Sequence, residues 1–556
     1  MTQYNQRLMS SFTGFARGAW GAYQALETLE AQRRARQQEK RVNQSLLEAE
    51  RVRRFVENPD ASGLLGDGRL GTLEDAAAEG MLDPQGLFLG GLEGEPLFYN
   101  GDAHLLNYAL TRSGKGRDIV LPNLAHVFNR SLVVNDIKDG ENAYASADHR
   151  KANGHRIIAI NPHGLLNAPS FKLNPFQRII NKGARGESIT EDSLQLCMSL
   201  VPPIQGEGKW VAAGAQQILA TWLEWSARFR PDLCTLSNMW RFVFRTLDEE
   251  LEAMQHCGLD GLEGQADMIQ RLKRAEDQWS AYESELVTAL WNFRPDTPLA
   301  AVTENSNFDP ETMRQEKTTL YLMADSDLLE ASSRWVSLTM SAIINTCAQS
   351  PGPIPVTCII DELANLPYMA VIPKALTLYA GKGVQLWGLC QGREALRDKG
   401  YSDHTIKNFE GQSGLLHVWS IKETDLLKDF ETWSGNTTVA VRGTNQSGGQ
   451  VDSASFGISE QKRPVLQSED IMRVGDGKQL IRTNGPHLYK ADRVAWFDVP
   501  SWTGKLKDVR KLAKQPVDFG RDETVSVRRL PPPPKALPSP PRELPKPPRK
   551  LSPPGD

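Results

Sequence analysis

Two segments that lie far apart in the chain each join a short apolar run to a cluster of small or charged residues, and together they restrict its fold more than any other feature. The first is HLLNYALTRSGKGRDIVLPN, around Lys115, and the second is VTCIIDELANLP, around Asp361 and Glu362. In the first, the apolar run to Leu110 is typical of a strand, and a helix is expected to begin near Ile119. Strand, loop and helix in that order are typical of a phosphate-binding loop.

The loop of the first segment consists of residues suited to an anion. Its backbone N–H groups are expected to point inward, the following helix adds its positive dipole end, and Lys115 supplies a charge for the β- and γ-phosphates. The general pattern G-x-x-x-x-G-K-[ST] is met only in part, because Ala109 replaces its first glycine and Gly116 replaces the hydroxyl residue that normally contacts Mg²⁺. Taken alone, the segment is equally consistent with an ordinary strand-to-helix turn. The predicted phosphate contacts are Thr111, Arg112, Ser113, Gly114, Lys115 and Gly116.

The second segment favours the nucleotide interpretation. Val356 to Ile360 form a short run with β-branched residues, which is typical of a parallel strand buried on both faces. Because side chains alternate along a strand, Asp361 and Glu362 are expected to point different ways, one to hold Mg²⁺ through water and the other to orient the attacking water. A strand-end aspartate can also cap the next helix. With a phosphate loop elsewhere in the chain, nucleotide hydrolysis is the better account.

Further polar residues are expected beside these two segments. A third strand, Val384 to Cys390, ends at Gln391, which is either placed to sense the γ-phosphate or simply solvated. Asp136 ends a neighbouring strand and is predicted to steady Mg²⁺ or the loop. Lys382 and Arg393 flank the Gln391 strand, and each is a candidate for stabilising charge in a neighbouring subunit's site, for contacting phosphate in a ring lumen, or for an ordinary surface charge.

Five segments of the chain occur in one order: GLFLG (86–90), HLLNYALTRSGKG, SLVVNDIKDGEN (131–142), DELANL and AGKGVQLWGLCQ (380–391). In this order they resemble the type IV secretion coupling proteins, the TraG/TraD-like ATPases of bacterial conjugation. The resemblance covers roughly residues 84–500 and includes a later stretch from KDFETWSG through KRP to SEDI. Glycine at position 116 is also familiar in the loop of that family.

The resemblance implies an α/β fold with a RecA-like P-loop ATPase domain, a mostly parallel sheet flanked by helices, and an inserted all-α domain. It implies ATP and Mg²⁺ as cofactors, with Lys115 on phosphate, Asp361 on Mg²⁺ and Glu362 on the hydrolytic water. The implied function is delivery of DNA with its relaxase, or of protein cargo, to a type IV secretion channel by a homo-hexamer. Two alternatives stay open: a soluble FtsK/HerA-like DNA translocase, and a nucleotide-binding cargo receptor without motor activity.

The pattern of residues divides the chain into five parts. We expect a charged N-terminal helix in 1–60, a first motor part in 61–186, an inserted all-α, cargo-facing domain in 187–304, a second motor part in 305–512, and a basic Pro-rich disordered tail in 513–556. Within the insert, Trp210, Trp222 and Trp225 are expected to be mostly core, whereas Trp240 and Trp279 are candidates for contact residues.

Composition limits the class of protein and its setting. A net charge of −4 excludes a strongly basic nucleic-acid coat protein, so any DNA contact is expected in a local patch or a ring lumen. Six cysteines without a C-x-x-C pair indicate reduced thiols and no structural zinc. No run approaches the ~20 apolar residues that cross a bilayer. We therefore expect a cytoplasmic protein, peripheral at the inner membrane through a membrane-anchored docking partner, with the N-terminal helix either solvated or docked on that partner.

Overall fold

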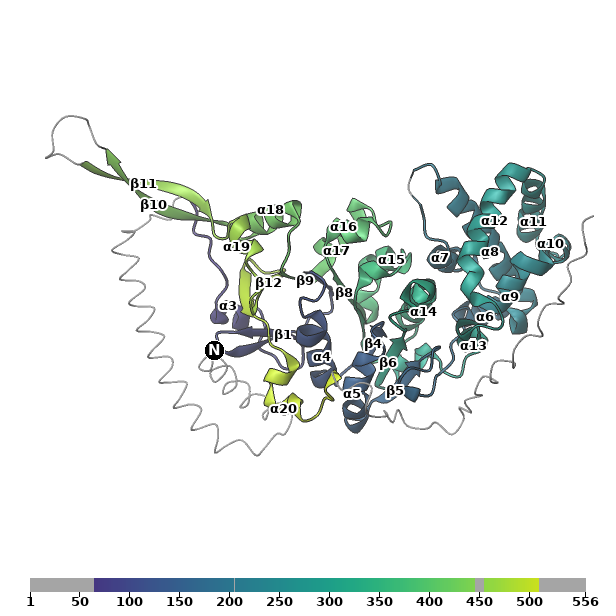
Figure 1. Cartoon of the computed structure of the whole chain (residues 1–556), viewed down its shortest axis with the longest axis horizontal. Coiled ribbons are helices and arrows are strands. Elements are labelled where there is room, and N and C mark those ends of the chain that lie inside the picture. The colour runs from purple at the N-terminus through teal and green to yellow at the C-terminus, as the bar shows by residue number, and fades with distance from the viewer. Residues whose placement is uncertain (1–64, 205, 446–454, 510–556) are drawn as a thin grey trace, which may run out of the picture.

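The computed structural model of the chain describes residues 65–204, 206–445 and 455–509 (Figure 1). The predicted N-terminal helix and the predicted Pro-rich tail both lie outside these residues. No helix among the described residues is long and apolar enough to cross a membrane. The described residues include all six cysteines, which are free, and every one except Cys257 is buried.

An eleven-stranded sheet forms the centre of the molecule. Its order is β2-β1-β13-β12-β9-β3-β8-β7-β4-β6-β5, and the pairs from β9 to β5 are all parallel, whereas those from β2 to β9 are antiparallel. The strands are β1 (Leu87–Leu92), β2 (Glu95–Tyr99), β3 (His104–Ala109), β4 (Ser131–Asp136), β5 (Arg156–Ile160), β6 (Thr318–Met323), β7 (Val356–Ile360), β8 (Val384–Cys390), β9 (Ser413–Trp419), β12 (Lys478–Thr483) and β13 (Leu488–Asp492).

The parallel half of the sheet is buried, and most residues of its strands are apolar. All residues of β3, β4, β6, β7, β8 and β9 are buried, as expected for strands covered on both faces. The covering helices connect these strands, and the predicted α/β class is therefore confirmed. The helices of this part are α3 (Leu73–Ala78), α4 (Leu121–His126), α5 (Glu141–Ala152), α14 (Leu329–Gln349), α15 (Val371–Leu378), α16 (Arg393–Arg397), α17 (Asp403–Gln412), α18 (Thr424–Trp433), α19 (Ser468–Met472) and α20 (Pro500–Thr503).

A helical insert interrupts the sheet between β5 and β6 and lies at one end of the molecule (Figure 1). Its helices begin at Gln177, ahead of the expected boundary at residue 187. In α8, Ala212, Ala215, Leu219 and Trp222 are buried at helical spacing, which explains why this stretch packs as a helix. The insert contains α6 (Gln177–Ala184), α7 (Thr190–Leu200), α8 (Lys209–Phe229), α9 (Leu236–Arg241), α10 (Leu247–Met254), α11 (Asp260–Lys273), α12 (Glu276–Leu290) and α13 (Pro298–Thr303).

A two-stranded ribbon of β10 (Asn436–Asn445) and β11 (Ser455–Pro464) extends away from the sheet (Figure 1). Its base is joined to the beginning of the described chain, since Gly68 N–H donates to Asn436 O at 2.8 Å and Thr438 N–H donates to Gly66 O at 2.9 Å. An isolated ribbon is at most marginally stable in water. The added segment therefore supports the ribbon at the point where it leaves the body of the protein.

Candidate functional site

The loop after β3 has a backbone shaped to surround an anion. Arg112 and Gly114 have positive φ values of 60° and 97°, so the backbone departs twice from the usual conformations before the helical turn η1 (Gly116–Val120) begins. Lys115 starts that turn and is only 3% exposed. Its Nζ donates to the backbone oxygens of Ala109 at 2.9 Å and Leu110 at 3.2 Å, which folds the side chain back over the loop. Strand, loop and helical turn therefore occur in the predicted order.

Two residues from the C-terminal part of the chain hold this loop, and sequence reasoning did not identify either. Trp419, at the end of β9, donates from Nε1 to Ser113 O at 3.0 Å. Arg493 donates from Nη1 to the same oxygen at 2.5 Å and lies 3.5 Å from the Asp118 carboxylate. Trp419 ends a strand that pairs with β3, but no local pattern marks Arg493, because its position depends on the order of the strands.

The end of β7 brings the predicted carboxylates to the loop. Glu362 Oε1 lies 3.3 Å from Lys115 Nζ, and the Glu362 side chain is buried. Glu362 has a left-handed backbone conformation with φ 53° and ψ 48°, which is uncommon for a residue with a Cβ. Such a conformation costs about 1–3 kcal/mol and is found mainly at functional sites. The adjacent turn stabilises it, since Asn365 N–H donates to Glu362 O at 2.7 Å.

Asp361 is held in place by residues at the end of β4. Asn135 donates from Nδ2 to Asp361 O at 2.7 Å and accepts from Asp361 N–H at 2.5 Å. Lys138 Nζ lies 2.8 Å from Asp361 Oδ2 and 3.5 Å from Glu362 Oε1, while its side chain remains 41% exposed. Burial lowers the pKa of Lys138, but the two carboxylates outweigh it and raise that pKa overall. Lys138 is therefore a charged partner of both acids.

Gln391 completes the cluster from the end of β8. Its Nε2 donates to Glu362 Oε2 at 2.7 Å. The structure thus brings Lys115, Glu362 and Gln391 together, with Asp361 beside Glu362 in the chain. β3 is adjacent to β8 in the sheet and β8 to β7, although β3 lies far from the other two strands in the chain, and the carboxyl ends of all three place these side chains at one edge.

Asp136 lies at the same edge but contacts a helix. Its Oδ1 accepts from Asn142 N–H at 3.3 Å, and its Oδ2 accepts from Ala143 N–H at 2.8 Å. Both oxygens therefore cap the beginning of α5. Burial raises the pKa of Asp136 to about 7, although these hydrogen bonds oppose the shift. The predicted contact of Asp136 with Mg²⁺ stays a prediction.

Of the two flanking basic residues, the structure corrects the interpretation of Arg393. Arg393 is buried, and its Nε and Nη2 donate to the two Glu410 carboxylate oxygens, both at 2.7 Å, while Nη2 also lies 2.6 Å from Asp429. A side chain tied in this way is not free to reach a neighbouring subunit or a lumen. Lys382 is exposed, but it precedes β8 and so lies at the opposite end of that strand from Gln391.

The residues at the sheet edge fit a nucleotide with Mg²⁺. Asp361 Oδ1 is a buried oxygen with no hydrogen-bond partner in the described structure, and it is available to a water or cation. Among the described residues no group of three or more His, Cys, Asp or Glu side chains is arranged to hold a metal ion. That is compatible with Mg²⁺, which typically binds through one or two carboxylates together with phosphates and water.

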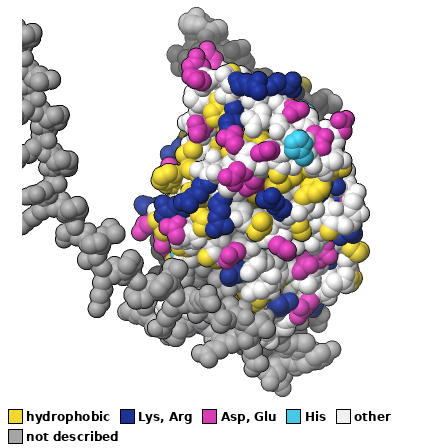
Figure 2. Space-filling view, turned by 90° about the vertical axis from the view of Figure 1, so that its right-hand side faces the viewer, with side chains coloured by type: hydrophobic (Ala, Val, Ile, Leu, Met, Phe, Trp, Pro, Cys, Tyr) yellow, Lys and Arg dark blue, Asp and Glu magenta, His cyan; other side chains and the backbone are white. Residues whose placement is uncertain are grey.

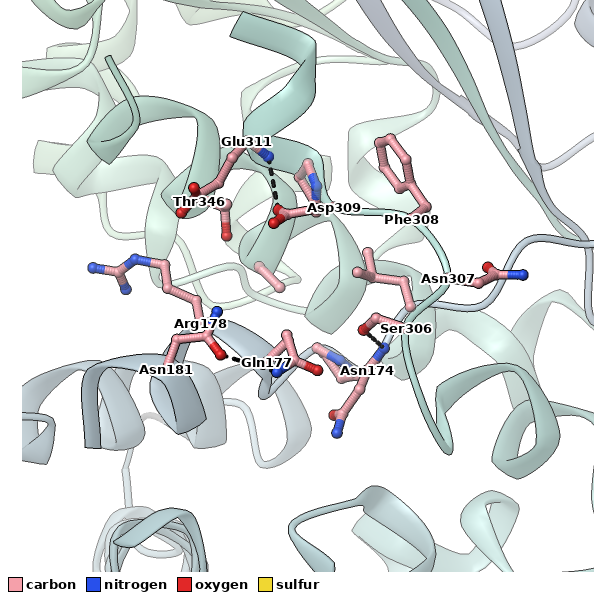
Figure 3. A pocket seen from close by; sticks show the side chains of 14 residues that line it. Asn174, Gln177, Arg178, Asn181, Ser306, Asn307, Phe308, Asp309, Glu311 and Thr346 are labelled. Carbon is pink, nitrogen blue, oxygen red and sulfur yellow. Dashed lines mark hydrogen bonds between the residues drawn. The ribbon is translucent and has the colours of Figure 1, made fainter. Parts of the chain in front are cut away.

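A pocket of about 510 Å³, with polar and apolar lining residues, lies where the insert joins the sheet (Figure 3). Several of its polar groups pair with one another: Ser306 Oγ accepts from Asn174 N–H at 3.0 Å, and Asp309 Oδ1 accepts from Glu311 N–H at 3.0 Å. Arg178 lies 3.3 Å from Asp192. We therefore interpret this pocket as the place where the segment leading into the insert (173–181) meets the segment leading out of it (306–311). It is distinct from the candidate site.

Comparison with known families gives a match over most of the chain. Residues 60–518 match the family model described as type IV secretory system conjugative DNA transfer. The chain is 23% identical over 407 residues to protein VirD4 of Agrobacterium fabrum, a match that covers 72% of this chain and 59% of VirD4. It is 21% identical over 424 residues to the conjugal transfer protein TraG of Rhizobium radiobacter, covering 71% and 62%. It thus spans about three fifths of the length of these relatives.

Comparison with solved structures gives a similar fold. The unbound bacterial conjugative coupling protein TrwBdeltaN70 matches with a TM-score of 0.56 at 14% identity, covering 77% of this chain and 92% of that one. The plasmid coupling protein TrwB in complex with ADP and Mg²⁺ matches with a TM-score of 0.55 at 16% identity, covering 77% and 94%. TrwB in complex with the ATP analogue ADPNP also matches, with a TM-score of 0.55. The predicted RecA-like α/β fold is thereby confirmed.

Proposed function

This chain belongs to the type IV secretory system conjugative DNA transfer family, and on that premise we propose that it is an ATP-hydrolysing coupling protein. The observation that carries the proposal is the convergence of Lys115, Glu362 and Gln391 at one sheet edge, where Glu362 lies between the other two. The complexes of TrwB with ADP and Mg²⁺ and with ADPNP support ATP and Mg²⁺ as the ligands of this chain.

Phosphate binding is the task of the loop at 111–116. A nucleotide phosphate would replace the Ala109 and Leu110 oxygens as the partner of Lys115, since a charge-assisted bond to phosphate is stronger than one to a neutral carbonyl. Trp419 and Arg493 hold Ser113 O and thereby keep the loop backbone in a fixed orientation. A loop fixed in advance stabilises developing charge without reorganising at the moment of reaction.

Hydrolysis requires an attacking water, and Glu362 is the residue proposed to orient it. Its left-handed backbone directs a buried carboxylate toward Lys115, and Gln391 fixes the second carboxylate oxygen at 2.7 Å. Asp361, through Oδ1, is proposed to hold Mg²⁺. When bound, Mg²⁺ neutralises charge on the β- and γ-phosphate oxygens. Lys138, paired with both acids, is proposed to balance their charge and to hold the two side chains in place.

Cargo movement is the finer part of the proposal. Family membership supports DNA with its relaxase, or protein, as cargo, and a type IV secretion channel as the destination. A homo-hexamer, a membrane-anchored docking partner and a position at the inner membrane are proposed on the same ground. Because Arg393 is held by Glu410, a basic residue acting between subunits must come from elsewhere in the chain.

The test is ATP hydrolysis by the full chain with and without single- and double-stranded DNA. Glu362→Gln is expected to lower the hydrolysis rate by about 100-fold or more, because an uncharged amide cannot accept the water proton. Glu283→Gln, an exposed substitution on α12, is the matched control and is expected to leave the rate unchanged.

The outcomes of this assay distinguish three possible functions of the chain. Hydrolysis that DNA stimulates, and that Glu362→Gln abolishes, supports a motor acting on DNA. If affinity for secretion channel components is absent as well, a soluble DNA translocase becomes the better account. If the wild-type chain binds ATP but does not hydrolyse it with either DNA, the motor proposal fails and a cargo receptor takes its place.

A further inference from the structure

A groove of about 820 Å³ lies on the surface close to the Glu362 segment, where no step of the proposed function requires one. It is lined by Pro202, Pro203 and Ile204, in the loop after α7, and by residues 397–400. Pro367 and Tyr368, which follow the η7 turn (Leu363–Asn365) after Glu362, also line it. The groove therefore joins the insert to the loop that carries the proposed water-orienting acid.

The lining has the chemistry that binds extended proline-rich chains. The Tyr368 ring lies against the buried Tyr401 ring, with centroids 4.9 Å apart, and the Tyr401 hydroxyl accepts from Met369 N–H at 3.1 Å. Tyr368 is thus supported from the core side while it lines the groove. Ile204 adds an apolar side chain that is 42% exposed. Aromatic grooves of this kind bind polyproline II segments, because that conformation exists before binding and little entropy is lost.

We propose that the occupant is this chain's own proline-rich segment, PPPPKALPSPPRELPKPPRK, at 531–550. Its sequence predicts polyproline II, and its prolines alternate with basic residues. Exposed Glu330 and Asp398 line the groove and complement those basic residues, while Lys399 offers a partner to Glu543. Both the apolar and the charged parts of the segment therefore find matching groups.

The covalent connection favours the chain's own segment over a segment from another molecule. The described chain ends just after Lys507, whose N–H donates to Ala145 O at 3.0 Å on α5. The beginning of α5 is capped by Asp136, at the same sheet edge as the groove. Residues 510–530 can span up to about 70 Å when extended, at ~3.3 Å per residue. A tethered segment also binds at an effective concentration on the order of millimolar.

Amide hydrogen exchange on the full chain tests this proposal. Wild type is compared with a full-length variant carrying Pro540→Ser, Pro541→Ser, Pro547→Ser and Pro548→Ser, and with Ile204→Asp in the groove. Leu233→Asp is the matched control, since Leu233 is a similarly exposed apolar residue in the insert, outside the groove. Exchange in peptides covering 365–370 and 397–401 is expected to accelerate about tenfold in both test variants, because at millimolar effective concentration a weak site is mostly filled. The control is expected to match wild type.

Equal exchange in wild type and in the proline variant would overturn the proposal. So would protection that disappears on dilution, because the occupant would then be a second copy. The experiment uses no nucleotide, so its result is independent of whether the chain hydrolyses ATP.

Discussion

The sheet edge and the helical insert differ in which side chains they bury and which they expose to solvent. At the edge, charged groups are buried and tied to one another, as with Lys115, Glu362 and Asp361. On the insert, large apolar groups are exposed, with Trp291 at 59% and Trp210 at 48%. Its outer face shows acidic, basic and apolar side chains intermixed (Figure 2). Chemistry requires charges fixed away from water, whereas binding a macromolecule requires accessible side chains.

The tryptophans of the insert differ among themselves in how deeply they are buried. Trp240 and Trp279, the candidates for contact residues, are partly buried, and Trp240 stacks on Phe244 with ring centroids 4.6 Å apart. Trp222 is buried in the helical core, as expected, but Trp210 is not. The largely exposed tryptophans of the described insert are therefore Trp210 and Trp291, while a contact role for Trp240 and Trp279 stays a prediction.

The largest effect on ATP hydrolysis is expected from a substitution in the phosphate-binding loop. Lys115→Ala should lower ATP hydrolysis by about 100-fold or more, because it removes a charge directed at the phosphates. Lys317→Ala, at an exposed position away from the loop, is the control and should retain wild-type hydrolysis. If Lys115→Ala hydrolysed ATP normally, the edge would not be a nucleotide site.

The buried ion pair between Arg393 and Glu410 tests whether a buried charge in this part of the protein stabilises the fold. Arg393→Ala should lower the free energy of unfolding by about 3 kcal/mol, because Glu410 would be left buried without its charged partner, although it still accepts from the Tyr108 hydroxyl. Arg397→Ala removes a more exposed arginine paired with Asp403 and should cost about 1 kcal/mol or less. Urea denaturation of both variants measures the difference. Equal losses would mean that Arg393 is effectively a surface residue.

A pH dependence is expected from Asp136. Its pKa is raised from 3.8 to about 7 by burial, so between these values the unfolded chain has released a proton that the folded chain still binds. The contribution of Asp136 to stability is therefore fully present below about pH 4 and declines as the pH rises to about 7. Asp136→Asn does not titrate, so its melting temperature relative to wild type should increase from pH 5 to pH 7.5 and then level off.

The control for this experiment is Asp403→Asn, an exposed substitution. Its melting temperature relative to wild type should not follow the same pH curve. A pH-independent difference for Asp136→Asn would show that Asp136 is ionised throughout and acts only as a cap of α5.

The smallest effect is expected on the insert. Trp291→Ser should change ATP hydrolysis and the melting temperature little, because its side chain is largely solvated. Trp222→Ser, in the buried core of the same domain, should cost about 3–5 kcal/mol. Thermal unfolding and hydrolysis assays on both variants compare them directly. A large loss of hydrolysis in Trp291→Ser would remove the distinction between the two regions.

Much of the fold and the candidate site could be predicted because the signals are local. The apolar run of β3 precedes a glycine and a lysine, and the β-branched run of β7 precedes Asp361 and Glu362, so each run specifies a strand together with the turn at its end. Helical spacing of apolar residues in α8 predicts the insert. These patterns depend on residues within a few positions of one another, which is the range over which backbone geometry repeats.

The tertiary structure alone decided which of these elements meet. The order β13-β12-β9-β3-β8-β7-β4 brings Glu362 within 3.3 Å of Lys115 and places Trp419 and Arg493 on the loop. It also buries Arg393 against Glu410, although the sequence around Arg393 is compatible with an exposed charge. The chain determines each strand by its own residues, whereas the neighbours of a strand follow from the packing of the whole sheet, which no local pattern encodes.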